Sequence, residues 1–338
     1  MPLLKNEFTI GMPHMVPGQL SEVELVKLIG DFQWLAISKS LNVPAKDIVN
    51  DIGERLYASF INLDLDLGGR TFSSFKEGAH IRVKHRAQFF ARRFAEGFFY
   101  FDDKEFPDAA LEEVSARDDL RQCATPWIYL TNALVTRETS NLRLRTFAPS
   151  TEVSDAACTQ REPDGLADQK RVQSTNVIPF PEYPNSNLIE GTSTEPFTYP
   201  IVPESDLNGA GLLYFARYIA VMNYGERHFL QNRLPLPVST GLVRFLSTEK
   251  RRIFYFANAD ETDNIAIYVS VRVSPVDEST VADKTQCVRL RFVFSTDLYR
   301  VSDGTLMAKS VASRVLGIPW SAKGVVTEAE RLQLQLGV

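Results

Sequence analysis

Cysteine is scarce in this chain of 338 residues, which contains only Cys123, Cys158 and Cys287. Three widely spaced thiols provide neither a disulfide framework nor a close pair that could hold a metal ion. Reduced thiols of this kind are typical of cytoplasmic proteins. The first residues, Met1 to Glu7, also lack the basic and then apolar profile of a secretion signal. We therefore expect a cytoplasmic protein.

Histidines, long apolar runs and cofactor motifs are also few or missing. The four histidines, His14, His80, His85 and His228, form no HExxH pattern, and so we expect no metal site. The sequence has no P-loop, GxSxG or GxGxxG motif, and so we expect no bound cofactor. No apolar run approaches the length of a membrane-spanning helix. The net charge of −5 and the pI of about 5.6 argue against a general nucleic-acid-binding protein.

What the sequence does contain is an internal repeat. A Phe-Thr pair followed by turn-rich residues and an amphipathic helix occurs near the N-terminus and again in the second half. The pairs begin at Phe8 and Phe197, which are 197−8 = 189 residues apart. The apolar stripes of the two helices are Leu25, Leu28, Ile29, Phe32 and Ala36, and then Leu212, Phe215, Ala216, Ile219 and Met222. A repeat of this length predicts two structurally similar halves.

In the first half, a long helix precedes several strands. Ser21 and Glu24 fit a capping box at the start of a helix that continues to about Leu41. Apolar residues alternate with polar ones over 81–89, which indicates a strand with one buried face. His85 lies on the apolar side of that strand, and so we expect it to be a core histidine. Strands are predicted at residues 56–67, 79–89, 92–101, 127–135 and 142–147.

The second half repeats this organisation. Asp206 or Asn208 is expected to cap its helix, while Gly209 and Gly211 relax the backbone at the helix entry. Asp303-Gly304 is a strong signal for a hairpin between residues 298–301 and 305–307. Strands are predicted at residues 242–246, 253–256, 265–273, 288–295 and 305–312.

The segment between the halves differs in composition. Residues 149–195 are rich in Ser, Thr, Asp, Glu, Asn, Pro and Gln, which indicates a linker or a long surface excursion. In each half, the apolar stripe of one helix must be buried, and a curved antiparallel sheet is the available surface. We therefore predict an α+β fold, a double hot dog. The predicted parts are an N-terminal hot-dog domain at 1–148, the linker at 149–195, a C-terminal hot-dog domain at 196–322 and a tail at 323–338.

The entry to the second helix offers hydrogen-bond donors. Gly209, Ala210 and Gly211 could present backbone N–H groups to an oxyanion at a helix N-terminus, or could serve only the close packing of helix against sheet. Both interpretations stay open. Asn208 and Asn132 carry side-chain amides that could donate to the same oxygen.

Other candidate residues also have two interpretations. His14, just ahead of the first helix, is either a catalytic residue or a structural residue of its turn. A basic group could meet phosphates or an acidic carrier domain, or could be a solvated strand face. Its members are Arg82, Lys84, Arg86, Arg92 and Arg93.

Several motifs point to one known family. In the first half they are Gly11-Met12-Pro13-His14, Gly18-Gln19-Leu20-Ser21-Glu22, Gly30-Asp31-Phe32-Gln33-Trp34 and Arg55-Leu56-Tyr57-Ala58-Ser59-Phe60. In the second half, residues 206–218, which begin Asp206-Leu207-Asn208-Gly209, look like the helix entry of hot-dog thioesterases. Together they resemble the bifunctional acyltransferase/decarboxylase family of polyketide biosynthesis, whose type member acts in the leinamycin pathway. The resemblance is weak over the linker and after about Trp320.

This resemblance implies a double hot-dog fold and a specific reaction. Methylmalonyl-CoA, or a related malonyl-CoA, would lose carbon dioxide, and the propionyl group would pass to the phosphopantetheine of an acyl carrier protein. The resemblance also implies that Tyr57 accepts the acyl group or donates a hydrogen bond to the substrate. Decarboxylation leaves an enolate, whose oxygen needs hydrogen-bond donors.

The remaining candidates follow from chemistry and position. His14, Ser59, Asn132 and Asn208 are candidates for catalysis, and Gly209, Ala210 and Gly211 for binding the substrate. Arg86 and Arg93 are predicted to bind the phosphates of CoA or an acidic carrier protein.

Two other functions stay open. One is a hot-dog thioesterase or dehydratase-like enzyme that acts on acyl-CoA or acyl-carrier substrates. The other is a non-catalytic module that binds a carrier protein. The sequence leaves the oligomeric state undecided, with a homodimer among the options.

Overall fold

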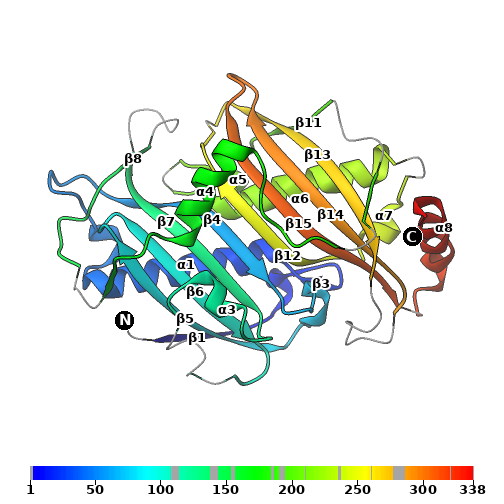
Figure 1. Cartoon of the computed structure of the whole chain (residues 1–338), viewed down its shortest axis with the longest axis horizontal. Helices are drawn as coiled ribbons and strands as arrows, with labels where there is room; N and C mark the ends of the chain where they lie inside the picture. The colour runs from blue at the N-terminus through cyan, green and yellow to red at the C-terminus, as the bar shows by residue number, and fades with distance from the viewer. Residues whose placement is uncertain are drawn as a thin grey trace.

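One curved antiparallel sheet runs through both halves of the protein (Figure 1). The structure is a computed structural model, and its strand order is β1-β5-β6-β7-β4-β12-β15-β14-β13-β10. The long helices α1 (Glu22–Leu41) and α6 (Phe215–Asn232) lie side by side against the same face of the sheet. The structure describes residues 3–106, 108, 114–137, 144–153, 157–183, 186–189, 195–209, 211–234, 237–259, 261–276, 286–319 and 321–337.

The repeat predicted from the sequence is confirmed by the order of the elements. The first half runs β1 (Leu4–Thr9), α1, β4 (Tyr57–Asp66), β5 (His80–Phe90), β6 (Phe94–Asp102) and β7 (Trp127–Arg137). The second runs β11 (Phe197–Pro200), α6, β12 (Leu246–Tyr255), β13 (Asn264–Pro275), β14 (Gln286–Arg300) and β15 (Leu306–Pro319). Phe8 and Phe197 lie in β1 and β11, which pair with the equivalent strands β5 and β13. The protein is an α+β double hot dog, as predicted.

Shorter elements connect these parts. The strands are β2 (Met15–Val16), β3 (Gln19–Leu20), β8 (Leu144–Thr146), β9 (Cys158–Thr159) and β10 (Asn187–Leu188). The helices are η1 (Met12–His14), η2 (Ala45–Asp47), η3 (Phe72–Ser74), α3 (Arg117–Leu120), α4 (Asp164–Thr175), α5 (Pro203–Asp206), α7 (Thr240–Val243) and α8 (Lys323–Leu336). The predicted tail at 323–338 thus contains a helix.

The two halves meet at the centre of the sheet. β4 pairs with β12, with Leu63 opposite Ile253, so that the hydrogen-bond ladder is continuous across the junction. On the inner face, Ile29 of α1 and Ile219 of α6 are fully buried in one apolar core that draws on both halves. The halves are therefore joined by both strand pairing and helix packing.

Local signals placed most elements correctly, with exceptions that have clear causes. Ser21 caps α1 by accepting a hydrogen bond from the backbone N–H of Glu24 (3.3 Å), but its own N–H bonds to the carbonyl of His14, and so the capping box is only half formed. The predicted strand at 242–246 is wrong. Ser239 caps the short helix α7 there, and β12 begins only at Leu246.

The predicted hairpin at Asp303-Gly304 is confirmed. Gly304 adopts a φ of +68°, a conformation that glycine reaches without strain. The backbone N–H of Arg300 bonds to the carbonyl of Thr305 across the turn (2.9 Å). The side chain of Asp303 accepts hydrogen bonds from the N–H of Thr305 and the guanidinium of Arg300. Local contacts of Asp303 and Gly304 therefore stabilise the hairpin, and this is why it could be predicted from the sequence.

The polar segment between the halves is an excursion over the outer face of the sheet. It contains α4, which crosses β4 and β7 on the side opposite α1 and α6 (Figure 1). The helix was not predicted because it has few apolar residues and therefore no apolar stripe. Val172 is the one that is buried in the outer-face core. Polar contacts hold the helix instead, and so apolar periodicity gave no signal.

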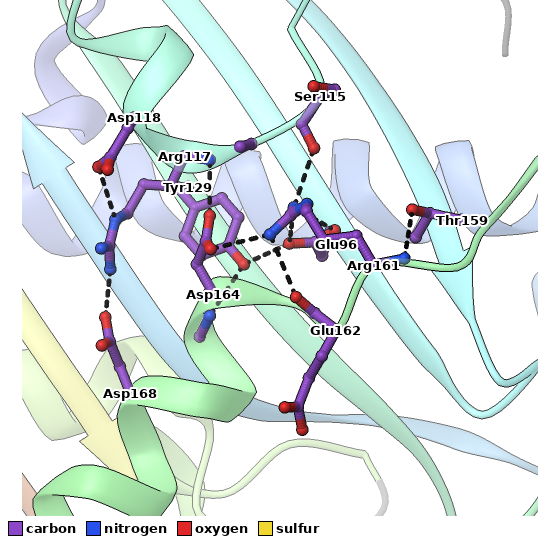
Figure 2. A network of polar contacts seen from close by, with 12 residues as sticks. Glu96, Ser115, Arg117, Asp118, Tyr129, Thr159, Arg161, Glu162, Asp164 and Asp168 are labelled. Carbon is purple, nitrogen blue, oxygen red and sulfur yellow. Dashed lines mark hydrogen bonds and ion pairs between the residues drawn. The ribbon is translucent and has the colours of Figure 1, made fainter.

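A buried polar network fixes this excursion to the sheet (Figure 2). Arg161 donates to both oxygens of Glu96 (3.0 and 3.1 Å) and to Asp164 (2.8 Å). The hydroxyl of Tyr129 donates to Glu96 at 2.6 Å and accepts from the backbone N–H of Gly165 at 3.0 Å.

A second network lies nearby, in which Arg117 and Arg252 each bond to both Asp64 and Asp168. These charge-assisted bonds replace the apolar packing that α4 lacks.

The described residues offer neither a candidate membrane-spanning helix nor a metal-binding cluster. None of the helices in that part of the chain is long and apolar enough to cross a membrane. No group of three or more His, Cys, Asp or Glu side chains within the described ranges could hold a metal ion.

Candidate functional site

A cavity of about 730 Å³ lies where the two central strands separate. The pairing of β4 with β12 ends at Asn62 and Phe254, and a β-bulge in β4 follows between Phe60 and Asn62. Ala58, Ser59 and Phe60 all line the cavity, although successive strand residues point to opposite faces of a sheet. The cavity therefore reaches both faces at the junction of the halves. Its other walls come from α1, β7, β8, α4, Asn208, residues 212–215, Tyr218 and residues 255–258.

The loop that leads into α6 forms one wall and is held by two asparagines. Asn208 accepts a hydrogen bond from the backbone N–H of Leu212 (3.1 Å), and Gly211, at a φ of +68°, completes the turn between them. Asn258, which follows β12, accepts from the N–H of Leu213 (2.9 Å). Both amide oxygens are thus used to shape the loop.

The N-terminus of α6 lies at the cavity without a side-chain cap. Its N-cap residue is Tyr214, and both Tyr214 and Phe215 line the cavity. Within the described part of the chain, the backbone N–H groups of Phe215 and Ala216 have no hydrogen-bond partner. The first N–H groups of a helix carry partial positive charge and suit an anionic oxygen. This end of α6 is therefore a candidate oxyanion site.

The prediction that Asp206 or Asn208 caps α6 is wrong, because neither side chain bonds to the backbone N–H groups at the N-terminus of the helix. Asp206 is fully buried, and it accepts hydrogen bonds from the hydroxyl of Tyr199 and the N–H of Val202, and pairs with Arg217. Its carboxylate stabilises the short helix α5 and the loop instead of capping α6. Because Asn208 is also used within the loop, the helix end stays open toward the cavity.

Two titratable groups line the cavity from opposite halves, Asp31 from the first and Tyr214 from the second. The side chain of Asp31 in α1 is exposed, but the protein around it partly desolvates the carboxylate and so raises its pKa. Burial, together with the charges of Asp31 and Glu24, raises the pKa of Tyr214 to about 12. Tyr214 is therefore a neutral hydroxyl at neutral pH.

Some of the residues predicted from sequence meet at this cavity. Ser59 and Asn208 line it, and Gly209 and Gly211 lie in the turn of the wall loop. Ala210 lies outside the described residues. The free backbone N–H groups of Phe215 and Ala216, a few residues after the glycines, are better placed as oxyanion donors than those of the glycines.

Tyr57 lies beside the cavity. It is half-buried on the outer face of β4, where it packs with Ile61, Ala133 and Val135, which do line the cavity. The guanidinium of Arg55 lies 5.0 Å from the centre of its ring. Tyr57 itself is not part of the lining, and its role stays a prediction.

His14 and Asn132 lie elsewhere. Nδ1 of His14 accepts a hydrogen bond from the N–H of Gly11 (3.0 Å), and this bond closes the turn before α1. Asn132 is fully buried on the inner face of β7, where its Oδ1 accepts a hydrogen bond from Gln33 (3.1 Å). Neither residue lines the cavity, and the structure does not bring them together with Ser59.

The predicted basic group is dispersed. Arg86 points from the outer face of β5 and is half-buried, which lowers its pKa, whereas Arg93 is exposed in the β5–β6 turn. Arg82 lies 3.9 Å from Glu7, and Lys84 pairs with Asp108 (2.7 Å). None of the four lines the cavity. Binding of phosphates or a carrier protein by Arg86 and Arg93 stays a prediction.

Sequence reasoning missed several residues of the site. Asp31 lies within a stretch that carried the family resemblance, but was not singled out. Tyr214 lies in a second such stretch. Asn258 and Gln169 gave no signal, because one follows β12 and the other belongs to the unpredicted helix α4.

The equivalent position in the other half is filled by charged side chains. There the first residue of α1, Glu22, bonds to Arg251 (2.7 Å), which also bonds to Glu226 (3.0 Å). Burial alone would raise the pKa of Glu226, but the charges of Arg251 and Arg314 hold it below its usual range. A smaller pocket of about 350 Å³ remains beside this network. The two copies of the repeat have therefore diverged into an open cavity and a buried ion network.

Comparisons with known proteins agree on the fold. No protein-family model matches the chain, and no curated protein matches its sequence at a significant level. Among solved structures, an acyl-ACP thioesterase from Bacteroides thetaiotaomicron is similar at 13% identity and a TM-score of 0.52, covering 92% of this chain and 97% of the other. A protein assigned as an oleoyl thioesterase from Lactobacillus plantarum is similar at 10% identity and a TM-score of 0.55, covering 94% and 97%. These likenesses show a shared double hot-dog fold over almost the whole chain.

Proposed function

We propose that this protein is an enzyme that acts on acyl thioesters of CoA or of an acyl carrier protein, and that the reaction takes place in the cavity between the halves. The observation that carries the proposal is the uncapped N-terminus of α6, whose free N–H groups lie at the cavity wall. Reactions at a thioester place negative charge on the carbonyl oxygen. Preorganised N–H donors stabilise that charge, and this is often a large part of the rate enhancement.

The shape and lining of the cavity suit such a substrate. Trp34, Phe60 and Phe215 give it apolar walls for an acyl group or the arm of a thioester. Ser59 and Gln169 add polar groups on the outer-face side. A volume of about 730 Å³ lies within the usual range of small-molecule sites.

Hydrolysis of the thioester is the first candidate reaction. Both solved structures reported above are described as thioesterases, and one as an acyl-ACP thioesterase. That support is by analogy of fold. The chemistry needs only water, oxyanion donors and a group that accepts a proton.

Decarboxylation with transfer of the acyl group is the second candidate, and a separate observation favours it. Three of the stretches that resemble the acyltransferase/decarboxylase family converge on the cavity, through Asp31 and Trp34, through Ser59 and Phe60, and through part of residues 206–218. In this version, methylmalonyl-CoA or a related malonyl-CoA is the substrate, and the N–H groups at α6 stabilise the enolate. An acyl carrier protein supplies the accepting thiol, and Tyr57 either accepts the acyl group as an intermediate or donates a hydrogen bond to the substrate.

Product analysis separates the candidates. The purified protein would be incubated with a panel of acyl-CoAs, with and without a carrier protein that bears phosphopantetheine, and all products would be measured by mass spectrometry. Hydrolysis gives free acid and CoA without the carrier. Transfer gives acylated carrier protein, and decarboxylation adds carbon dioxide. Binding of the carrier protein without any turnover would contradict the proposal and favour a non-catalytic binding module.

A further inference from the structure

Asp31 is the one carboxylate among the described residues that line the cavity. It lies in the middle of α1, in the first half, whereas the candidate oxyanion donors belong to the second half. Within the described part of the chain it has no hydrogen bond or ion pair, unlike Glu24 on the same helix, which pairs with Lys27 (2.8 Å). A carboxylate that lines a cavity without a partner is available to a bound molecule.

The position of Asp31 is fixed by its neighbour. Gly30 packs directly on Phe215, since a Cβ at Gly30 would lie 2.6 Å from Cζ of that ring and 3.7 Å from the hydroxyl of Tyr214. Asp31, the next residue, is close enough to Tyr214 to raise the pKa of its phenol. The carboxylate therefore lies near the open N-terminus of α6, where a thioester carbonyl would be held.

The other polar groups that line the cavity accept a proton at neutral pH less readily than the carboxylate of Asp31 does. Tyr218 and Tyr255 are buried and donate their hydroxyls to the backbone carbonyls of Ala257 (2.8 Å) and Phe215 (3.4 Å). The guanidinium of Arg145 has hydrogen-bond donors and no acceptor. Ser59 and the amide side chains are very weak bases. Asp31 remains as the group with a suitable proton affinity.

We propose that Asp31 accepts the proton from the nucleophile that attacks the thioester. The inference rests on the proposed function, and it holds for water or for a carrier thiol as the nucleophile. The O–H or S–H bond of the nucleophile breaks as its oxygen or sulfur bonds to the carbonyl carbon, and the proton passes to the Asp31 carboxylate. When the carbon–sulfur bond to the leaving thiol breaks, Asp31 returns the proton to that sulfur, so that charge and protons balance.

The charged groups around Asp31 set the pH range of this step. Tyr214 lies close to it at the entry of α6, and Arg145 lines the same cavity from β8. On its own helix, Glu24 and Lys27 pair with each other. A general base acts only when deprotonated, and partial desolvation raises the pKa of Asp31. The acid limb of kcat/KM is therefore expected above the value of about 3.9 for an unperturbed aspartate.

The test compares Asp31→Asn and Asp31→Glu with Glu24→Gln as a matched control on the same helix. We expect Asp31→Asn to lower kcat/KM by about 10²–10³ and to lose the acid limb, because a general base contributes about that much. Asp31→Glu should keep a limb with a shifted midpoint, and Glu24→Gln should keep both rate and profile. Thermal denaturation should show all three variants folded.

The outcomes separate this inference from the proposed function. If Asp31→Asn keeps a rate within about threefold of the parent, or loses rate while its acid limb is unchanged, the role of Asp31 is wrong although the protein still processes thioesters. If the parent protein itself turns over no acyl thioester, the proposed function fails and the inference fails with it.

Discussion

The rings of Phe60 and Phe215 stack face to face, with their centroids 3.6 Å apart and their planes 7° apart. Phe60 belongs to β4 of the first half, and Phe215 is the first residue of α6 in the second. Both line the cavity, and Gly30 of α1 leaves the room that the Phe215 ring occupies. The site is therefore built jointly by the two halves, and this contact holds the uncapped end of α6 in place.

A Gly30→Ala substitution tests this contact. The added Cβ would lie 2.6 Å from the Phe215 ring, and so the ring must shift into the cavity. We expect a loss of about 1–3 kcal/mol in the free energy of unfolding, as for overpacked cores, and a higher KM for thioester substrates. Chemical denaturation measures the first effect. The matched helical control is Gly324→Ala, because nothing lies within 4 Å of its Cβ position. Equal stability of the two variants would contradict the prediction.

The ion network at the other junction is predicted to be structural. Arg251 has no exposed surface, and it compensates the carboxylates of both Glu22 and Glu226. Arg251→Ala would leave the buried carboxylate of Glu22 without a cation and Glu226 with Arg314 as its remaining partner, and we expect a loss of about 3–5 kcal/mol in unfolding free energy. Lys46→Ala, which breaks an exposed pair with Asp47, should cost less than about 1 kcal/mol.

A second combination separates the charge from the packing. Arg251→Met together with Glu22→Gln removes one charge pair but keeps most of the volume, while Glu226 keeps its bond to Arg314, and this variant should recover a large part of the lost stability. If this variant is no more stable than Arg251→Ala, the packing of the arginine matters more than its charge.

The stability of the protein should depend on pH through His85. Its Nε2–H donates to Oδ1 of Asn6 (2.8 Å), and its ring lies between Phe32 and Phe99. Burial, reinforced by the charge of Lys39, lowers the pKa of His85 to about 4, from about 6.5 in the unfolded chain. Protonation thus favours the unfolded state, and stability falls as the pH drops from about 6.5 toward 4, by up to roughly 1.4 kcal/mol per pH unit.

The measurement is the free energy of unfolding by urea between pH 7.5 and pH 5. His85→Phe removes the titrating group, and its pH dependence should be flatter than that of the parent. A parental slope in His85→Phe would mean that other groups cause the loss of stability at low pH.

The fold was predictable because its signals are local and repeated. The spacing of Leu25, Ile29 and Ala36 predicted helix α1, and the alternation of apolar and polar residues along 81–89 predicted strand β5. Asp303-Gly304 predicted a hairpin. The pairing of β4 with β12 was not predicted, because strands far apart in sequence carry no local signal of which strand they pair with. His85 was placed in the core by strand parity alone. Each of these inferences uses neighbours within a few residues.

The site was less predictable because its parts meet only after folding. Asp31 lies at the edge of the apolar stripe of α1, and nothing in the local pattern marks it as facing the second half. Asn258 reaches the loop at Leu213 from the end of β12, 45 residues away in sequence. The open end of α6 results from Asp206 being used elsewhere, and sequence cannot show where a buried carboxylate finds its partners.

Close packing of α4 on the sheet leads to a further prediction. A Cβ at Gly165 would lie 1.8 Å from Oδ1 of Asn62 and 2.4 Å from Oγ1 of Thr131. Gly165→Ala should therefore lift the start of α4 from the sheet and weaken the polar network around Tyr129. We expect faster cleavage of the excursion in limited proteolysis and lower turnover, since Gln169 of α4 lines the cavity. Gly241→Ala, with only ordinary contacts at 3.6 Å, is the control and should be cleaved at the parental rate.

The last prediction compares Tyr57 with Ser59, two residues that lie on the same face of β4. Ser59 lines the cavity, whereas Tyr57 packs beside it against Ile61 and Ala133. A residue that forms a covalent acyl intermediate must reach the thioester carbon. We therefore expect Tyr57→Phe to keep turnover within about tenfold of the parent, with no acylated enzyme in either protein, and Ser59→Ala to lower turnover further.

Acid-quenched samples analysed by intact-mass spectrometry would show any acyl-enzyme, and steady-state kinetics would give the rates. Ala58→Ser, on the neighbouring position of the same strand, controls for small changes in the cavity wall. Loss of transfer in Tyr57→Phe, together with an acylated parent enzyme, would overturn this expectation. It would assign Tyr57 the acceptor role that the family resemblance implies, and would require the ring to swing into the cavity during turnover.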